Sequence, residues 1–412
     1  MIEGQYYNAF RVGSHITRYV LMRAYSGDTL PILVCTALLA VFLGGCADPA
    51  PVEATATVTL PAPTPLPEPS RTVPPSGTAP AVEGFPTQPE DVPFPAESWP
   101  EGAWPAGVDR AMVDAAVDEA FADGAVQRVR AVVIVHGGQI VYERYSPNLA
   151  DHASAMMPGY SIAKSITAML AGILVRDGRL DVEQPAAVAE WATPGDPRGE
   201  ITLDDLLRMS SGLEWAQGRP PGFGDQGQML GSVDAAAYAA EKELLHPPGT
   251  AFLYSSGNTM IVDRFLAGKV GSGEAFEAFM RAELLDKIGL APINLHFDPA
   301  GTWHGWYGAD TTARDFARLG LLYLRDGVWD GERILPEGWV AYSRTPSATN
   351  PEYGAGWWLD LARPAVFYAV GVNGQTIAVD PAHDLTFVTL ATDSTISLPV
   401  SEAILDAFAG GR

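Results

Sequence analysis

A serine and a lysine lie three residues apart in the stretch PGYSIAKSITAML, which covers residues 158–170. At this spacing on a helix the two side chains share one face about one turn apart, so an uncharged Lys164 amine can reach the Ser161 hydroxyl. Such a pair can do nucleophilic chemistry, with Ser161 attacking and Lys164 taking its proton. The alternative is that Lys164 is a solvated charge on a helix surface. Only Lys164, of four lysines, has a serine three positions before it, which favours the catalytic interpretation.

A lysine can act as this base only if its surroundings lower its pKa. The usual value of about 10.4 leaves almost no free amine at pH 7, and lowering it by ~3 units costs roughly 4 kcal/mol, which burial can supply. The residues near Lys164 are apolar: Ile162, Ala163, Ile166, Ala168 and Met169. If Ser161 opens a helix that runs to about Arg176, its backbone N–H is among the unpaired amides that can hold an oxyanion.

A second stretch, FLYSSGNTMIV at residues 252–262, places Tyr254 and two serines between apolar segments. A phenol held near an amine can move a proton between a nucleophile and a leaving group. Taken alone, the stretch is typical of a turn before a helix. Tyr254 is therefore a candidate catalytic residue whose role depends on where the fold places it.

Three stretches in this order carry a resemblance: Ser161–Lys164 (SIAK), Tyr254–Ser256 (YSS) and Val372–Gln375 (VNGQ). They resemble the motifs of the serine β-lactamase and penicillin-binding protein superfamily. The similarity is to its class C branch of esterases, D-aminopeptidases and 6-aminohexanoate-dimer hydrolases. Residues 206–215, 311–340 and 353–359 resemble that branch too, so the similarity extends from about Trp104 to Phe408.

The resemblance implies a role for each matched residue. Ser161 corresponds to the acylated nucleophile, Lys164 to its base, and Tyr254 to the tyrosine that protonates the leaving group and later activates water. The backbone amides of Ser161 and Gln375 correspond to the oxyanion hole. Ser256, Asn373 and Gly374 correspond to substrate-binding positions, and Ser256 stands where many class C β-lactamases carry Asn.

The third motif departs from the β-lactamase and D,D-peptidase pattern. Those enzymes have Lys-Thr-Gly, whose cation helps to hold the substrate's carboxylate, whereas this chain has Val372, Asn373 and Gly374. The departure favours small esters, or amides without that carboxylate, as substrates. Hydrolysis of β-lactams or of D-aminopeptide, cell-wall-type amides stays as the alternative.

Other classes of protein fit the sequence less well. GYSIA at 159–163 nearly matches the G-x-S-x-G elbow of α/β-hydrolases, but Ala163 replaces the last glycine and no strong strand leads into Gly159. The histidines form no H-E-x-x-H pair, and no cofactor motif is present, so we expect no metal and no cofactor. A non-enzyme alternative is a sensor that is acylated once and stays acylated.

The first 45 residues predict a lipoprotein leader. Pro31–Leu43 is a continuous apolar run, too short to span a bilayer at roughly 20 residues per crossing but typical of a secretory signal. The ending Leu43-Gly44-Gly45-Cys46 resembles the lipobox of bacterial lipoproteins, which implies lipidation at Cys46 and an extracytoplasmic protein anchored to a bacterial membrane. Met22, used as the start, would give a leader of ordinary length.

Residues 46–98 are rich in Pro, Thr and Ala, which predicts an extended tether, and residues 99–412 form the hydrolase domain. The formal net charge of −23 speaks against nucleic acid and anionic lipid as partners. We expect a small-molecule ester or amide as the partner, and membrane contact only through the anchor. The oligomeric state is left open.

Strand-like segments lie at both ends of the predicted domain. Residues 130–135 and 140–145 flank a Gly137-Gly138 turn, and four more strands are expected at 356–361, 366–370, 376–379 and 385–391, before a closing helix at 401–408. The middle, roughly 150–345, is mainly helical, with helices expected at 161–176 and 203–209 and one capped by Thr312. This order predicts an α+β fold, similar to that of β-lactamases and transpeptidases, in which an antiparallel sheet built from both chain ends is flanked by helices.

Overall fold

The computed structural model describes residues 84–122, 129–147, 149, 152–218 and 224–410. The predicted leader, the lipidation site Cys46 and most of the predicted tether lie outside these residues and stay predictions. No helix in the part of the chain that the structure describes is long and apolar enough to cross a membrane.

A six-stranded antiparallel sheet joins the two ends of the domain, in the order β2-β1-β11-β10-β9-β8. Its strands are β1 (Val129–His136), β2 (Gln139–Tyr145), β8 (Trp358–Leu359), β9 (Phe367–Gly371), β10 (Gln375–Asp380) and β11 (Leu385–Ala391). The first strand pairs with the last, with Val133 opposite Val388. The predicted sheet, built from both chain ends, is confirmed.

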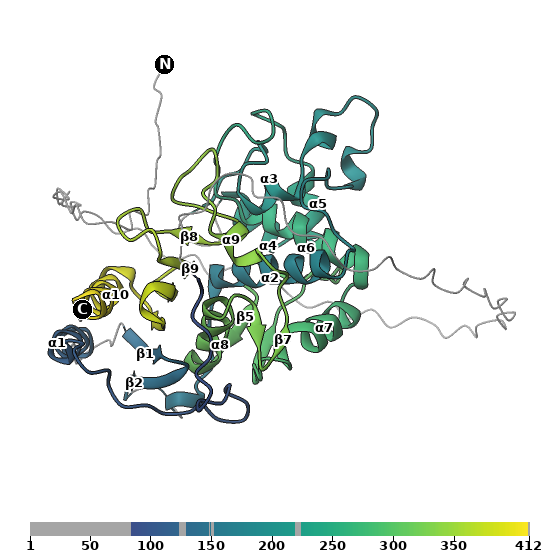
Figure 1. The fold of residues 1–412 in the computed structure, drawn as a ribbon. Helices are drawn as coiled ribbons and strands as arrows, with labels where there is room; N and C mark the ends of the chain where they lie inside the picture. Colours follow the sequence, from purple (N-terminus) through teal and green to yellow (C-terminus); the bar gives the residue numbers. More distant parts are fainter. Residues whose placement is uncertain (1–83, 123–128, 148, 150–151, 219–223, 411–412) are drawn as a thin grey trace, which may run out of the picture. The chain divides into compact units, whose positions relative to one another are not determined.

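Both faces of this sheet are buried. Val132 and Ile134 of β1 pack with α1 (Arg110–Phe121) and α10 (Ser394–Ala409), which lie together on one side of the sheet (Figure 1). The alternate residues Ala131, Val133 and Val135 belong to a second core that includes α8 (Ala313–Leu324). Side chains alternate across a strand, so a continuous run of apolar residues fills both cores.

The middle of the chain is mainly helical, as predicted. Its helices are α2 (Ala163–Arg176), α3 (Leu203–Leu207), α4 (Gly224–Leu230), α5 (Ala235–Ala240), α6 (Ser256–Val270), α7 (Glu274–Met280) and α9 (Trp339–Ser343). Short strands complete it: β3 (Met157–Pro158), β4 (Ile293–Leu295) and β5 (Ala309–Thr311) in one sheet, and β6 (Val328–Trp329) with β7 (Glu332–Arg333) in another. The Thr312 cap is present, since its side chain accepts a hydrogen bond from Asp315 N at the start of α8.

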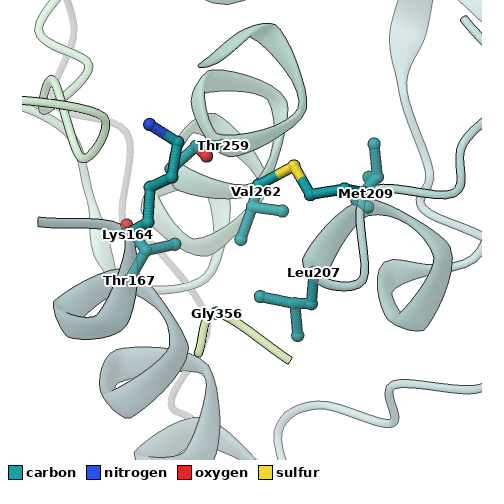
Figure 2. Close-up of a pocket in the computed structure, with 8 residues that line it drawn as sticks. Lys164, Thr167, Leu207, Met209, Thr259, Val262 and Gly356 are labelled. Atoms are coloured by element: carbon teal, nitrogen blue, oxygen red, sulfur yellow. The ribbon is translucent and has the colours of Figure 1, made fainter. Parts of the chain in front are cut away.

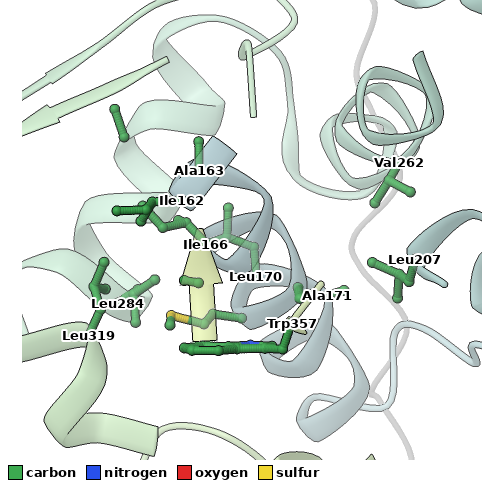
Figure 3. Packing of buried hydrophobic residues seen from close by; sticks show 14 of the residues in the cluster. Ile162, Ala163, Ile166, Leu170, Ala171, Leu207, Val262, Leu284, Leu319 and Trp357 are labelled. Atoms are coloured by element: carbon green, nitrogen blue, oxygen red, sulfur yellow. The ribbon is translucent and has the colours of Figure 1, made fainter. Parts of the chain in front are cut away.

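The helix α2 is buried on all sides from Ala163 to Val175. Ile166 and Leu170 lie among apolar side chains from elements far away in the sequence, including Leu319 and Trp357 (Figure 3). A helix that is hydrophobic all round is buried in the core of a protein. Since α2 follows the Ser161 turn directly and carries Lys164, the core fixes the position of both residues.

Two boundaries at the C-terminal end differ from the predicted ones. The helix α10 begins at Ser394, seven residues before the predicted start, and runs through Pro399. The side chain of Asp393 caps it by accepting from Thr395 N. The strand expected at 356–361 is only Trp358–Leu359, because it pairs at the edge of the sheet with the first two residues of β9.

Residues 84–98 lie against the hydrolase domain, although their composition assigned them to the tether. Arg318 of α8 donates to the Ala96 carbonyl oxygen (2.8 Å), and Arg325 donates to the side chain of Gln88 (2.9 Å). The ring of Phe94 contacts Trp329 at 5.0 Å between centroids. The folded region therefore extends back from residue 99 to Gly84.

Candidate active site

Ser161 lies in a single 3-10 turn, Tyr160–Ile162, immediately before α2. The preceding backbone is held against β5: β3 pairs with this strand, and Gly159 N donates to the carbonyl oxygen of its first residue, Ala309, at 2.9 Å. A side chain at Gly159 would collide with Phe316, since a Cβ there would lie 2.7 Å from its ring. Tyr160 has a φ of +48°, a value that non-glycine residues adopt rarely and mostly where the surroundings enforce it. The Ser161 hydroxyl is thus presented from a fixed turn.

Lys164 follows on the first turn of α2 and is almost completely buried. Its amine lies 3.1 Å from Ser161 Oγ, 3.4 Å from Ser256 Oγ and 3.3 Å from the Trp306 carbonyl oxygen. Burial lowers the pKa of Lys164 to about 7, and the nearby charge of Asp263 acts in the opposite direction. A substantial fraction of the amine is therefore uncharged at neutral pH and can accept the Ser161 proton.

A cavity of about 10 Å³ lies beside Lys164 (Figure 2). This volume is about the minimum that holds one water molecule. Besides Lys164 and Thr167, the cavity is lined by Leu206, Leu207, Met209, Thr259, Val262 and Gly356. The amine points away from Leu207 and Val262 (Figure 2), so the carbon chain of Lys164 contacts the apolar lining while its nitrogen faces Ser161.

Tyr254 lies with its ring over the amine, 5.0 Å from Lys164 Nζ to the ring centroid. It packs against Tyr353 (5.9 Å) and Trp358 (5.4 Å), and burial raises the pKa of Tyr254 to about 12 in spite of a hydrogen bond with the Ser161 side chain. Its phenol is therefore protonated at neutral pH and can donate to a leaving group. The structure thus brings Ser161, Lys164 and Tyr254 together.

Ser256 is completely buried at the start of α6, and three donors converge on its hydroxyl. They are Lys164 Nζ (3.4 Å), Gln217 Nε2 (3.1 Å) and Gln226 Nε2 (3.3 Å). Neither glutamine was identified from the sequence, because no motif marks residues 216–226. Two carboxamide groups therefore stand next to the position where many class C β-lactamases have an asparagine.

The third motif forms the turn between β9 and β10. Gly371 of β9 lies against the Ser161 turn, since a Cβ there would be 2.3 Å from the Gly159 carbonyl oxygen. The side chain of Gln375 accepts a hydrogen bond from Ala391 N (2.9 Å) and donates one to Ala391 O (2.8 Å), which ties β10 to β11. Its side chain is thus engaged with β11, and the group that the resemblance assigns to the oxyanion hole is its backbone amide. The end of β9 therefore borders the Ser161 turn.

The other two residues of the third motif have separate surroundings. Asn373 is exposed and has a φ of +70°. Gly374 has a φ of +92° and packs against α10, where a Cβ would lie 2.2 Å from Ser397 Oγ. Gly374 thus allows the close approach of α10, a packing role that sequence reasoning did not assign to it.

The described residues contain no group of three or more His, Cys, Asp or Glu side chains arranged to hold a metal ion. His304, in the loop before β5, is buried and lies 3.3 Å from Trp306 Nε1. Trp303 and Trp306 of the same loop are buried as well. The loop contributes to the site through the Trp306 backbone carbonyl, which no side-chain pattern could indicate.

Comparison with known proteins relates the whole domain to one family. The profile of the family described as Beta-lactamase matches residues 110–409. A 6-aminohexanoate-dimer hydrolase from Paenarthrobacter ureafaciens is 25% identical over 292 residues, which cover 64% of this chain and 72% of the relative. A beta-lactamase from Pseudomonas fluorescens is 26% identical over 165 residues, or 39% of this chain and 44% of that protein.

Solved structures share the fold. A proposed 6-aminohexanoate-dimer hydrolase from Bacillus anthracis superposes with a TM-score of 0.62 at 22% identity, covering 77% of this chain and 88% of its own. A penicillin-binding protein homologue from Caulobacter crescentus has a TM-score of 0.58 at 17% identity and covers 74% of this chain and 99% of its own.

Proposed function

The chain belongs to the beta-lactamase family and is a serine hydrolase, and on that premise we propose that it cleaves small esters or amides through a covalent acyl-enzyme on Ser161. One observation carries the proposal: a buried lysine amine with a pKa of about 7 lies 3.1 Å from the Ser161 hydroxyl. A lysine in water would be protonated and useless as a base. Here the base is ready before substrate binds.

In the proposed acylation step, uncharged Lys164 accepts the proton of Ser161 while Ser161 Oγ forms a bond to the substrate's carbonyl carbon. The negative charge moves to the carbonyl oxygen, where the backbone amides of Ser161 and Gln375 are the proposed donors; one such donor is worth about 3 to 4 kcal/mol. The tetrahedral intermediate collapses when the bond to the leaving group breaks. Tyr254 gives its proton to the leaving oxygen or nitrogen and regains one from Lys164.

Deacylation repeats these steps with water as the nucleophile. Tyr254 and Lys164 together accept a proton from water, which attacks the acyl carbon, and Ser161 Oγ leaves and recovers its proton. The phenol is suited to this relay because its ring lies 5.0 Å from Lys164 Nζ and it is hydrogen-bonded to the Ser161 side chain. Every group returns to its starting state, so the cycle needs no cofactor.

Two features support small esters or carboxylate-free amides as substrates. Val372 stands where the family's third motif supplies a lysine cation, so that a substrate carboxylate lacks this partner. Ser256, Gln217 and Gln226 line the Lys164 side of the site with uncharged polar groups. The relative from Paenarthrobacter ureafaciens is described as a 6-aminohexanoate-dimer hydrolase, and this similarity keeps that dimer among the candidate substrates as well.

Hydrolysis of β-lactams or D-amino acid amides is the second candidate function. It is favoured by the similarity to the beta-lactamase of Pseudomonas fluorescens. A panel of four kinds of substrate separates the two candidate functions: p-nitrophenyl esters, nitrocefin, D-amino acid amides and linear aminohexanoate amides. We expect kcat/KM for an ester to exceed that for nitrocefin at least 100-fold, and the reverse order would replace the first proposal by the second.

The proposed nucleophile is tested with Ser161→Ala and, as the control, Ser165→Ala in the first turn of α2. Ser165 is buried and donates to the Gly356 carbonyl oxygen, away from the Ser161 hydroxyl. We expect Ser161→Ala to lose both turnover and labelling by a fluorophosphonate, whereas Ser165→Ala keeps both. Labelling of Ser161→Ala at the wild-type rate would refute the assignment.

A single equivalent of ester product from the wild-type protein would identify an acylated sensor instead of an enzyme.

A further inference from the structure

Asp263 is a completely buried carboxyl group in α6 that the proposed reaction does not use. Both of its oxygens accept hydrogen bonds: Oδ1 from Thr167 Oγ1 at 2.8 Å and Oδ2 from Gly305 N at 3.0 Å. A buried acid is costly unless its oxygens are satisfied in this way. The question is what the protein gains from placing one here.

The first partner connects Asp263 to the helix that carries the proposed base. Thr167 lies three residues after Lys164 on α2, so the two side chains share a face of that helix. The bond from Thr167 therefore fastens α6 to α2 one turn beyond Lys164. The Asp263 carboxyl and the Lys164 amine also interact through their charges.

The second partner connects Asp263 to a loop that contacts the same lysine. A side chain at Gly305 is excluded, because a Cβ would lie 2.2 Å from Thr167 Oγ1 and 2.3 Å from Asp263 Oδ2. The next residue, Trp306, turns its carbonyl oxygen to Lys164 Nζ at 3.3 Å. Two successive backbone groups are thus held, the Gly305 amide by Asp263 and the Trp306 carbonyl by Lys164.

We propose that Asp263 is a positioning residue for Lys164: it anchors the Gly305–Trp306 backbone so that the Trp306 carbonyl oxygen keeps the lysine amine beside Ser161. Without the anchor, the Gly305 amide loses its buried acceptor and the peptide that carries the Trp306 carbonyl can turn away. Lys164 Nζ then loses one of its three hydrogen-bond partners and spends less time within reach of Ser161 Oγ. This inference rests on the proposed function, because it takes Lys164 to be the base.

Asp298 provides a matched control. It is also buried, at 5% exposed, and its oxygens also accept two hydrogen bonds, here from the backbone amides of Ala235 (2.9 Å) and Thr302 (2.7 Å). It stabilises the loop that precedes Trp303, but none of its bonds leads to Lys164. Truncating Asp263 leaves one buried hydroxyl and one buried amide without an acceptor, and truncating Asp298 leaves two amides without one, so each variant loses two hydrogen bonds to a buried carboxyl group.

The experiment compares Asp263→Ala with Asp298→Ala in the full chain. The second-order rate of fluorophosphonate labelling is measured from pH 5 to 9, together with thermal unfolding. Wild-type labelling is expected to rise with pH through about 7, as Lys164 loses its proton, and then to level off. We expect Asp263→Ala to lower the plateau at least tenfold and Asp298→Ala to leave it within threefold of the wild type.

The pH profile separates positioning from a general structural role. Around Lys164 Nζ, the described groups are the Asp263 carboxyl from α6, the Tyr254 ring, the Ser161 and Ser256 hydroxyls and the Trp306 carbonyl. Burial raises the pKa of Asp263 well above its usual range, while Thr167, the Gly305 amide and the charge of Lys164 act to lower it. The ionised form of Asp263 and the Trp306 carbonyl both favour the ammonium form of Lys164, so losing them moves the midpoint of the acidic limb to lower pH. We expect a shift of at least half a pH unit in Asp263→Ala and none in Asp298→Ala.

A plateau lowered less than tenfold, an unmoved midpoint, or an equal loss in Asp298→Ala would each overturn the inference. If Asp263→Ala does not fold, Thr167→Val and Thr167→Ser replace it, since only valine removes the hydroxyl that binds Asp263. We then expect the plateau of the labelling rate to be at least threefold lower in Thr167→Val and unchanged in Thr167→Ser. Equal labelling rates in these two variants would overturn the inference. Absence of labelling in the wild-type protein would instead refute the proposed function itself.

Discussion

Two lysines of this protein, Lys164 and Lys242, have similar neighbours and opposite states. Each lies over a tyrosine ring, Lys164 at 5.0 Å from the centroid of Tyr254 and Lys242 at 4.3 Å from that of Tyr238. Lys242, however, forms an ion pair with Asp225, and it hydrogen-bonds to the Tyr238 hydroxyl at 2.9 Å. Burial acts to lower the pKa of Lys242, but these partners outweigh it and raise the pKa above its usual value.

The difference shows that a tyrosine beside a lysine does not make a base. Lys164 has only neutral groups within hydrogen-bond distance, and its burial is nearly complete. Desolvation therefore dominates and lowers its pKa to about 7. Lys242 instead stabilises its segment, because Asp225 also accepts Ala216 N (2.6 Å) and so holds the chain next to Gln217.

The largest expected effect is on activity when each lysine loses its amine. Methionine is similar in length to the carbon chain of lysine and cannot take a proton. We expect Lys164→Met to lower kcat/KM for an ester by about 10³-fold, within the usual range for loss of an acid–base group, and Lys242→Met to lower it less than fivefold. Steady-state kinetics with a p-nitrophenyl ester measures both, and similar losses in the two variants would remove the distinction between the lysines.

The next largest effect is expected from removing the hydroxyl of each neighbouring tyrosine, Tyr254 beside Lys164 and Tyr238 beside Lys242. Tyr254→Phe removes only the phenolic hydroxyl and keeps the ring. This hydroxyl is proposed to donate a proton to the leaving group and to accept one from water, so we expect kcat to fall about 100-fold. The acyl-enzyme should then accumulate, which intact-mass spectrometry detects after mixing with ester. Tyr238→Phe removes the hydroxyl that donates to Asp225 at 2.6 Å, and we expect kcat to change less than threefold. Rapid deacylation in Tyr254→Phe would contradict the proposed relay.

The smallest effect concerns stability and has opposite signs for the two lysines. The pKa of Lys164 is about 7 in the folded state and about 10.4 in the unfolded state, so the unfolded state binds the proton more tightly and the buried lysine destabilises the protein below pH 10. The cost at pH 7 is roughly 4 kcal/mol, less the hydrogen bonds that the amine makes. We therefore expect Lys164→Met to raise the free energy of unfolding by about 2 kcal/mol.

The increase in the free energy of unfolding caused by Lys164→Met should shrink as the pH rises toward 10, because the lysine of the unfolded wild-type protein then loses its proton too. For Lys242 the folded pKa is raised, so its stabilising contribution is fully present at pH 7. We expect Lys242→Met to lower the free energy of unfolding by about 1 kcal/mol, as is usual for a partly buried ion pair with hydrogen bonds. Urea unfolding at pH 7 and pH 9 measures both variants, and destabilisation by Lys164→Met would contradict the desolvated amine.

Much of the fold could be predicted from local patterns. The apolar runs of β1 and β11 and the Gly137-Gly138 turn gave strands whose pairing follows from their places at the two chain ends. The start of α10 was missed, because Pro399 lies within the helix. The docking of residues 84–98 was missed too, because it depends on Arg318 and Arg325, which lie more than two hundred residues later.

The candidate site divides in the same way. Ser161, Lys164, Tyr254 and Ser256 were identified from ordered motifs, and the structure brings their side chains together. Gln217, Gln226 and Asp263 were not identified, because glutamines in an irregular segment and an aspartate within a helix carry no pattern of their own. The contact from Trp306 is made by a backbone carbonyl, which every residue has.

The sequence by itself determined which reactive groups this protein has and that Ser161 and Lys164 share a face, since helical spacing is a local property. Only the tertiary structure decided that the amine of Lys164 is desolvated and has a lowered pKa, whereas Lys242 is a cation in an ion pair. The reason is physical: the pKa of an amine depends on how much water and how much opposite charge surround it. Both are set by segments such as α6 and the Gly305–Trp306 loop, which packing brings to Lys164 from more than ninety residues away.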